Sequence, residues 1–179
     1  MTAPEDPTDL MFQAVSFAAR AHRHQVRKDG TTPYAAHPFR VCLVVRHVFG
    51  IDDVKVLTTA VLHDTIEDTT TDFDDLAEKF GTEVATWVAA LSKDMRLQDV
   101  AKEDAYHQVL ATAPWQVLIC KLADLYDNLS DSPTLTLKSR EKALLRATHV
   151  LDVIRPKLPS ECQGAFAIVE RKVLEMKRG

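Results

Sequence analysis

Apolar residues recur along the chain at intervals of three and four, which is the spacing of one face of an α-helix. In residues 9–22, Phe12, Val15, Ala19 and His22 fall on such a face, and Asp9 is placed to cap the start of the helix. Valine and isoleucine are frequent, but they do not alternate with polar residues as they would in a half-buried strand. The pattern therefore predicts helices and no strand.

Most of the predicted helices carry their own start or stop signals. Residues 37–50 begin with a proline in the first turn and end in glycine, residues 72–81 also end in glycine, and Thr82 is placed to cap the helix that follows. The remaining predicted helices are 52–68, 82–94, 100–113, 115–131, 137–154 and 160–176. Together these ranges predict an all-α fold.

The 179 residues fit one domain, 1–179, with a flexible N-terminus over residues 1–8. The long irregular segments are 26–38 and 130–136, and loops of this kind often carry ligand-binding groups on a rigid scaffold. The sequence therefore predicts a compact helical domain with its binding residues concentrated near these segments.

Composition excludes several classes of protein. The chain is 46% apolar and 27% charged, as in ordinary soluble proteins, and it has no run of about 18 apolar residues that would predict a membrane span. Acidic residues stand where a signal peptide would be basic, and Cys42, Cys120 and Cys162 lie in apolar contexts that favour buried free thiols. A net charge of −4 gives no reason to expect a nucleic-acid partner. We expect a cytoplasmic protein, as a monomer or homodimer.

Charge is unevenly distributed along the chain. The stretch from Arg20 to Arg46 is basic and contains only one acid, Asp29, whereas the stretch from Asp64 to Glu78 is densely acidic. Solvated helix faces would explain such runs equally well. The alternative is that the first stretch binds a polyphosphate and the second a cation.

The segment VLHDTIEDTTTD places His63 and Asp64 at the end of an apolar helix, where they suit a divalent metal if further ligands join them. His37 and Asp124 are the candidates, since both lie in apolar helices that would pack nearby. Asp124 could instead form a salt bridge to Lys121 or Arg40, and His37 could cap a helix or bond to a loop. Five other histidines are expected at the surface or in packing roles, namely 22, 24, 47, 107 and 149.

Glu67 and Asp68 follow the His-Asp pair by one helical turn and are expected to reach the same rim of the site. Beside a metal, one carboxylate can deprotonate water and the other can protonate the departing oxygen. Their mutual repulsion would raise the pKa of one of them. Without a metal they would simply face solvent at a fraying helix end.

Four motifs carry a family resemblance: RKDGTTPYAAHP, VLHDTIEDT, FGTEVATWVAALSK and KLADLYDNL. The histidine, the adjacent His-Asp pair and the remote aspartate resemble the HD phosphohydrolase superfamily. In order and spacing, the motifs resemble the hydrolase domain of the RelA/SpoT group, and most closely its stand-alone small alarmone hydrolases. The resemblance covers roughly residues 10–160.

The resemblance implies a role for each matching position. The implied metal ligands, usually for Mn²⁺, are His37, His63, Asp64 and Asp124. The implied catalytic residues are Glu67 and Asp68, with Asn128 near the ribose and the reaction centre. Arg27 would pack on guanine and Lys28 would position the ligand, while Tyr34 in the same loop could bind substrate or only pack. The implied reaction removes the 3′-pyrophosphate of ppGpp or pppGpp, leaving GDP or GTP.

The sequence departs from the family pattern beside Asn128. Leu125 replaces an expected cation, Asp127 adds a negative charge, and Ser130 and Asp131 replace an Arg-Thr-like pair. These changes bear on how the ribose and 5′-phosphates are held. Two alternatives follow: a phosphohydrolase for another nucleotide, such as an adenine alarmone, NADPH or a nucleoside monophosphate, and a non-catalytic alarmone sensor.

Overall fold

The structure is a computed structural model that describes residues 6–131 and 136–178. Its α-helices are α1 (Pro7–Ala21), α2 (Ala36–Leu43), α3 (Val54–Leu62), α4 (Thr65–Asp68), α5 (Phe73–Phe80), α6 (Thr82–Leu91), α7 (Asp99–Leu110), α8 (Trp115–Asp131), α9 (Leu137–Ile154) and α10 (Gln163–Arg178). Shorter helical segments are the π-helical η1 (Val44–Val48) and the 3₁₀ segments η3 (Arg155–Lys157) and η4 (Ser160–Cys162). The predicted all-α class is confirmed.

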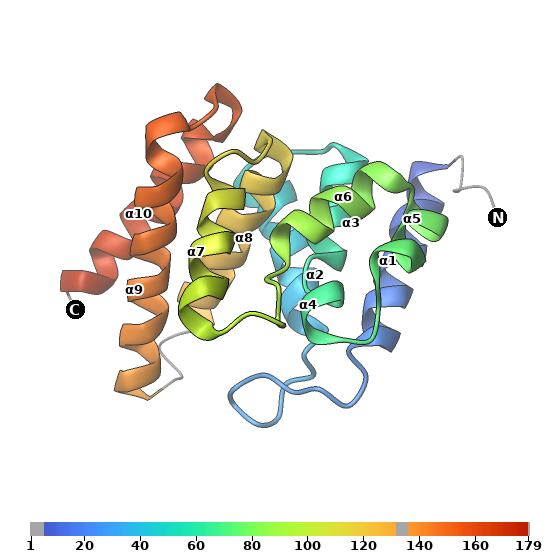
Figure 1. Ribbon diagram of the computed structural model, residues 1–179, viewed down its shortest axis with the longest axis horizontal. Helices are drawn as coiled ribbons and strands as arrows, with labels where there is room; N and C mark the ends of the chain where they lie inside the picture. Colours follow the sequence, from blue (N-terminus) through green and yellow to red (C-terminus); the bar gives the residue numbers. More distant parts are fainter. Residues whose placement is uncertain (1–5, 132–135, 179) are drawn as a thin grey trace.

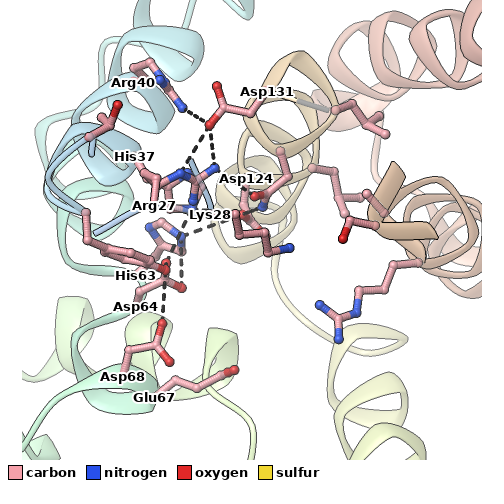
Figure 2. A pocket seen from close by; sticks show the side chains of 18 of the residues that line it. Arg27, Lys28, His37, Arg40, His63, Asp64, Glu67, Asp68, Asp124 and Asp131 are labelled. Atoms are coloured by element: carbon pink, nitrogen blue, oxygen red, sulfur yellow. Dashed lines mark hydrogen bonds and ion pairs between the residues drawn. The ribbon is translucent and has the colours of Figure 1, made fainter. Parts of the chain in front are cut away.

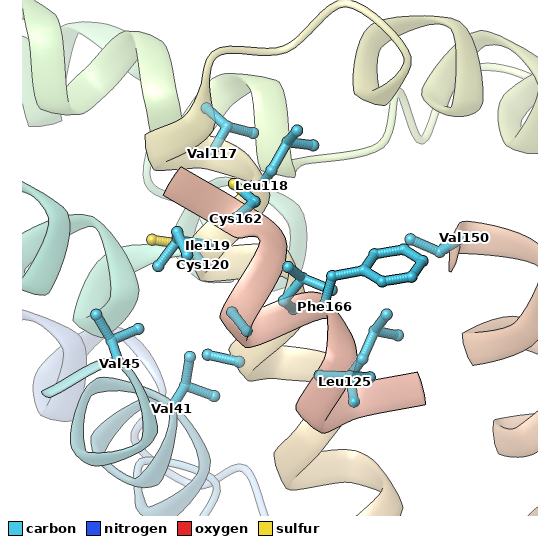
Figure 3. Close-up of a cluster of buried hydrophobic side chains, with 14 of the residues drawn as sticks. Val41, Val45, Val117, Leu118, Ile119, Cys120, Leu125, Val150, Cys162 and Phe166 are labelled. Carbon is cyan, nitrogen blue, oxygen red and sulfur yellow. The ribbon is translucent and has the colours of Figure 1, made fainter. Parts of the chain in front are cut away.

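The apolar side chains form two neighbouring clusters. One surrounds α8, where it packs against α2, α3 and α10 (Figures 1 and 3). The second joins α1, α3, α5 and α6 at the other end of the molecule. Helix α3 contributes to both, and Val56 and Ala60 on one side and Val61 and Leu62 on the other are almost completely buried. Helix α3 thereby fixes the position of the polar residues that follow it.

Helix α1 differs from the prediction in its cap and in its buried face. Asp6, and not Asp9, is the N-cap, and its carboxylate accepts a hydrogen bond from the Thr8 N–H at 2.7 Å. Leu10, Ala14 and Ala18 face the core, whereas Phe12 is 65% exposed and Ala19 is also exposed. The small side chains of Ala14 and Ala18 allow close packing on α3, which rotates the larger Phe12 outward.

The predicted helix 52–68 is interrupted at His63 and Asp64, which form a turn between α3 and α4. The His63 ring bonds to the Ala60 carbonyl at 2.9 Å, and the Thr65 hydroxyl donates to the Leu62 carbonyl at 2.7 Å. Side chains thus satisfy carbonyls at the end of α3, in competition with continued helix. The expectation of one continuous helix was wrong, and the break presents both predicted ligands to one side.

Helices α5 and α6 begin with different kinds of cap. Thr82 is the first residue of α6 and makes no capping bond; the N-cap is Gly81, with φ of 87°. At α5, Asp72 and Asp75 form a reciprocal capping box. Gly81 can occupy this left-handed region without the steric cost of a Cβ, so it separates α5 from α6.

The loop between α1 and α2 is ordered by its own hydrogen bonds. Val26 and Pro33 form an isolated antiparallel bridge, and Arg27 N donates to the Thr32 carbonyl at 2.8 Å. Hydrogen bonds from the Thr32 side chain and from the backbone of Thr31 and Thr32 lower the pKa of Asp29 to about 2. Figure 1 shows this loop at the lower edge of the molecule, below α2 and α4.

Some sequence-based expectations concern the chain ends, a loop and the cysteines. Residues 1–5 of the predicted flexible N-terminus lie outside the described residues, and residues 7 and 8 belong to α1. Of the predicted loop 130–136, residues 132–135 lie outside the described residues, and Ser130 and Asp131 belong to α8.

All three cysteines are free thiols, and burial raises the pKa of Cys42 to about 11. In the part of the chain that the structure describes, no helix is both long and apolar enough to cross a membrane.

Candidate active site

A cavity of about 520 Å³ lies where the α1–α2 loop, α2, the α3–α4 junction, α8 and α9 meet (Figure 2). Every residue for which the family resemblance implies a role lines it: Arg27, Lys28, Tyr34, His37, His63, Asp64, Glu67, Asp68, Asp124 and Asn128. The fold therefore brings together residues that are up to about a hundred positions apart in the sequence.

The four predicted metal ligands converge at the base of this cavity. Nε2 of His37 lies 3.4 Å from Oδ2 of Asp64 and 3.2 Å from Oδ1 of Asp124. Nε2 of His63 lies 3.1 Å from Oδ1 of Asp64 and 3.9 Å from Oδ1 of Asp124. Donor atoms of His37, His63 and Asp124 all lie within 4.8 Å of one another. This arrangement has the residue types and the spacing of a site for one divalent ion.

The imidazole hydrogen bonds suit a metal site. Nδ1 of His63 pairs with the Ala60 carbonyl, so it is the protonated nitrogen in the neutral ring, and the buried Nε2 has no hydrogen-bond partner among the described residues. Nδ1 of His37 lies 2.7 Å from Asp127, which likewise leaves Nε2 directed at the site. Two imidazole nitrogens and two carboxylates fit manganese, iron or zinc better than calcium.

The carboxylates give this site a strong demand for positive charge. Burial opposes a charge on His37, but hydrogen bonds to Asp124, Asp127 and Asp64 outweigh it and raise the pKa of the imidazole well above its usual value. Burial likewise opposes a charge on His63, and the adjacent Asp64 outweighs it to raise the pKa of that ring. The same negative field would attract a divalent cation.

The predicted acid pair lies on α4, next to His63 and Asp64 (Figure 2). Glu67 accepts a hydrogen bond from the Lys93 N–H at 2.8 Å, and Asp68 is 3.0 Å from the Tyr34 hydroxyl. Burial, followed by the charge of Asp64, raises the pKa of Asp68; burial is also the main cause that raises the pKa of Glu67. The expected mutual repulsion is not among the main causes of either shift, because the two side chains are anchored to different partners.

Tyr34 connects a predicted ligand to the acid pair. Its hydroxyl is 2.6 Å from Asp64 and 3.0 Å from Asp68, and burial together with the negative charge of Asp64 raises its pKa well above the usual range. Its ring lies against His22, with centroids 4.8 Å apart. Tyr34 is thus more than a packing aromatic, because its hydroxyl touches two carboxylates of the site.

Arg27 crosses the cavity and contacts the end of α8. Its Nη2 lies 2.8 Å from Asp131 and 3.2 Å from the Asn128 side-chain oxygen, and its guanidinium is 5.7 Å from the Tyr34 ring centroid. Asn128 in turn donates from Nδ2 to Oδ1 of Asp124 at 2.5 Å. Asn128 therefore connects the predicted base-binding arginine to a predicted metal ligand.

The sequence did not single out several cavity residues. Lys93, Lys142 and Arg146 line the cavity from the α6–α7 loop and α9, and Lys121, considered only as a salt-bridge partner, lines it while it holds Asp124 at 2.9 Å. Arg40 pairs with Asp127 and Asp131, and not with Asp124 as the alternative supposed. Periodicity could identify those on α2, α8 and α9 as polar helix positions, but not which helix they would face.

Two of the four departures from the family pattern, Leu125 and Asp131, line the cavity. Leu125 lines the cavity at 5% exposure, Asp131 binds Arg27 and Arg40, and Asp127 contacts His37 and Arg40. Ser130 is exposed, and its hydroxyl donates to the Tyr126 carbonyl at 2.8 Å. The two added acids thus hold arginines of the site in place.

An all-helical fold whose adjacent His-Asp pair meets a second histidine and a remote aspartate defines the HD class of proteins. The HD domain family matches residues 14–153 of the chain, and the chain belongs to this family.

Relatives with known names match most of the chain. A Danio rerio protein named guanosine-3′,5′-bis(diphosphate) 3′-pyrophosphohydrolase MESH1 is 38% identical over 125 residues, covering 69% of each chain. A Drosophila melanogaster protein of the same name is 32% identical over 178 residues, covering 96% of this chain and 95% of that one. A solved structure, described as a metazoan ortholog of SpoT that hydrolyzes ppGpp, has a TM-score of 0.81 at 29% identity and covers 99% of this chain and 97% of its own.

Proposed function

We propose that this protein is a metal-dependent hydrolase that removes the 3′-pyrophosphate of ppGpp or pppGpp, giving GDP or GTP and pyrophosphate. The observation that carries the proposal is the convergence of His37, His63, Asp64 and Asp124 beside two further acids in a cavity edged by cations. The names of the similar proteins support the same substrate.

The proposed cofactor is one Mn²⁺ ion, held by His37, His63, Asp64 and Asp124. When bound, a divalent ion polarises a phosphoryl oxygen and makes water a stronger acid. Nε2 of His63, Nε2 of His37 and the carboxylates of Asp64 and Asp124 around them are the groups that such an ion would contact.

The acid pair performs the proton transfers. Water forms a bond to the phosphorus next to the ribose, the bond from that phosphorus to O3′ breaks, and one carboxylate of Glu67 and Asp68 accepts the proton of water. The other, in its protonated form, gives a proton to the departing O3′. Because burial raises the pKa of both carboxyls, the protonated form of either is more available near neutral pH than for an exposed acid.

The opposite end of the cavity suits a polyanion. Burial and the neighbouring charges of Arg146, Arg27 and Lys142 lower the pKa of Lys28 below its usual value. Burial is the largest cause of this shift, and the three neighbouring cations add a local positive charge that a phosphate group would neutralise. The 5′-phosphates of the substrate are placed here, with the 3′-pyrophosphate at the metal site.

The substrate assignment is tested with a panel of ppGpp, pppGpp, their adenine counterparts, NADPH and simple monophosphates, assayed with Mn²⁺. We expect pyrophosphate release from the guanosine compounds, falling to background after chelation and returning on addition of Mn²⁺. Faster turnover of NADPH or an adenine compound would reassign the substrate. Activity that survives chelation would reject the metal mechanism, and binding of ppGpp without turnover of any panel member would favour a sensor.

Arg27→Ala is expected to raise KM for ppGpp on the order of tenfold, the size of one lost cation–π or charge-assisted contact, with little effect on kcat. Arg27 lies beside Asn128 and Tyr34 and is not one of the groups that move protons, so its loss weakens binding of ground state and transition state alike. Initial-rate kinetics measure both constants. Arg23→Ala is the matched control, because Arg23 is exposed and does not line the cavity. An unchanged KM for Arg27→Ala would remove this residue from the proposed binding site.

We also propose an oligomeric state and a cellular compartment for the protein. All proposed site residues come from a single chain, so a monomer or a homodimer would be competent. Three free thiols, two of them buried, fit a reducing compartment such as the cytoplasm.

A further inference from the structure

Asp127 is a buried acid for which the proposed reaction gives no role. It is 4% exposed, and it departs from the family pattern to which the neighbouring motif belongs. An ionised carboxylate at this depth is costly unless its oxygens are bonded. The contacts of Asp127 therefore indicate what it does.

Both oxygens of Asp127 are occupied. Arg40 binds in a forked manner, with Nε at 2.7 Å from Oδ1 and Nη2 at 3.0 Å from Oδ2, and Nδ1 of His37 lies 2.7 Å from Oδ2. The Arg27 guanidinium is 3.7 Å from the same oxygen. The forked pair offsets the charge of the carboxylate and fixes its plane, so Asp127 presents a rigid acceptor to the imidazole.

Helical spacing explains how one ring is held from both sides. Asp124 and Asp127 are three residues apart on α8, and His37 and Arg40 are three residues apart on α2, which packs against α8. Asp124 lies 3.2 Å from Nε2 of His37, while Asp127 meets Nδ1. Two carboxylates one turn apart thus take the two nitrogens of a single imidazole.

We propose that Asp127 is a positioning residue for His37, and that it sets the affinity of the metal site. A carboxylate that accepts from Nδ1–H keeps the lone pair of Nε2 directed at the ion and makes that nitrogen a stronger ligand. His63 has only the neutral Ala60 carbonyl in the equivalent place, so His37 is the more strongly supported imidazole of the two. The inference rests on the proposed metal site and is independent of the substrate.

Asp127→Asn removes the charge with little change of shape. An amide has only one acceptor oxygen, so it cannot serve both the Arg40 fork and His37, and its own N–H groups would face their donors. We expect Mn²⁺ to bind about 10–100-fold more weakly, measured by competition with a chromophoric chelator. Thermal unfolding in the presence of chelator checks that the variant is folded.

Asp131→Asn is the matched control. Asp131 belongs to the same acidic face of α8 and binds Arg27 and Arg40, the latter at 2.5 Å. The close carboxylates around the His37 ring come from Asp64, Asp124 and Asp127. Its replacement should leave the Kd for Mn²⁺ unchanged. An equal loss of affinity in both variants would show that general negative charge, and not the contact with His37, supports the ion, and would overturn the proposal.

A second measurement uses the wild-type protein loaded with Zn²⁺ as a diamagnetic probe. The Nδ1 proton of His37 should give a low-field proton NMR signal that exchanges slowly with water, and Asp127→Asn should abolish it. An unchanged Kd in Asp127→Asn, or a wild-type His37 ring that lacks this proton signal, would overturn the proposal. Failure of the wild type to bind any divalent ion would overturn the metal site itself, whereas metal binding without ppGpp turnover would reject only the proposed reaction.

Discussion

Replacing Glu67 by glutamine or Asp68 by asparagine is expected to lower kcat by a factor on the order of 10² to 10⁴, with metal still bound. Each amide keeps the shape of the acid and one acceptor oxygen, so the bonds from the Lys93 N–H and the Tyr34 hydroxyl can persist. What is lost is the ability to accept or release a proton at the reacting oxygens. KM should change far less than kcat, because the effect falls on the transition state.

Steady-state kinetics and metal content measured on the same samples check this expectation. Asp74→Asn serves as the control, since Asp74 is an exposed acid on α5 that does not line the cavity. Loss of metal from the Glu67 or Asp68 variants would mean that these residues are ligands and not proton-transfer groups. A kcat within tenfold of the wild type would exclude acid–base catalysis by the residue concerned.

Ile119→Ala is expected to lower the free energy of unfolding by about 2–5 kcal/mol. Ile119 is 1% exposed in the N-terminal half of α8, inside the cluster shown in Figure 3, where Val41 of α2, Val45 of η1 and Phe166 of α10 also contribute. Truncation removes buried methyl groups and leaves a cavity that neighbours on three other helical segments cannot fill without moving.

Urea denaturation followed by circular dichroism measures the change. Leu145→Ala, on α9 at 71% exposure, is the control and should stay within about 0.5 kcal/mol of the wild type. A destabilisation of Ile119→Ala no larger than that of Leu145→Ala would show that the cluster around α8 is loosely packed.

Local sequence signals predicted most of the helices because periodicity, proline, glycine and capping acids act within a few residues. The bounds of α8 and α9 agree with the predicted ranges 115–131 and 137–154. The break in the predicted helix 52–68 could not be predicted from the same local signals. His63 and Thr65 bond to carbonyls at the end of α3 and break the helix, and this choice between side-chain and backbone partners depends on what surrounds the turn.

At the site, too, the local sequence predicted some features and missed others. Residue types in the motifs predicted which side chains would gather, and the geometry brings Nε2 of His37 within 3.4 Å of carboxylate oxygens of Asp64 and Asp124, and Nε2 of His63 within 3.1 Å of Asp64. The motifs did not predict that Arg40 would pair with Asp127, or that Lys142 and Arg146 of α9 would edge the cavity. A helical pattern gives the face on which a residue lies, but not the helix that this face will meet.

The sequence by itself determined that this protein is helical, where most helices begin and end, and which residues can bind a cation or transfer a proton. Only the tertiary structure decided which carboxylate meets which imidazole, which arginines are held by acids, and how far burial moves each pKa. The physical reason is range: hydrogen bonds within a helix are fixed by neighbours in the chain, whereas ion pairs and desolvation depend on the packing angle between helices that are far apart in sequence.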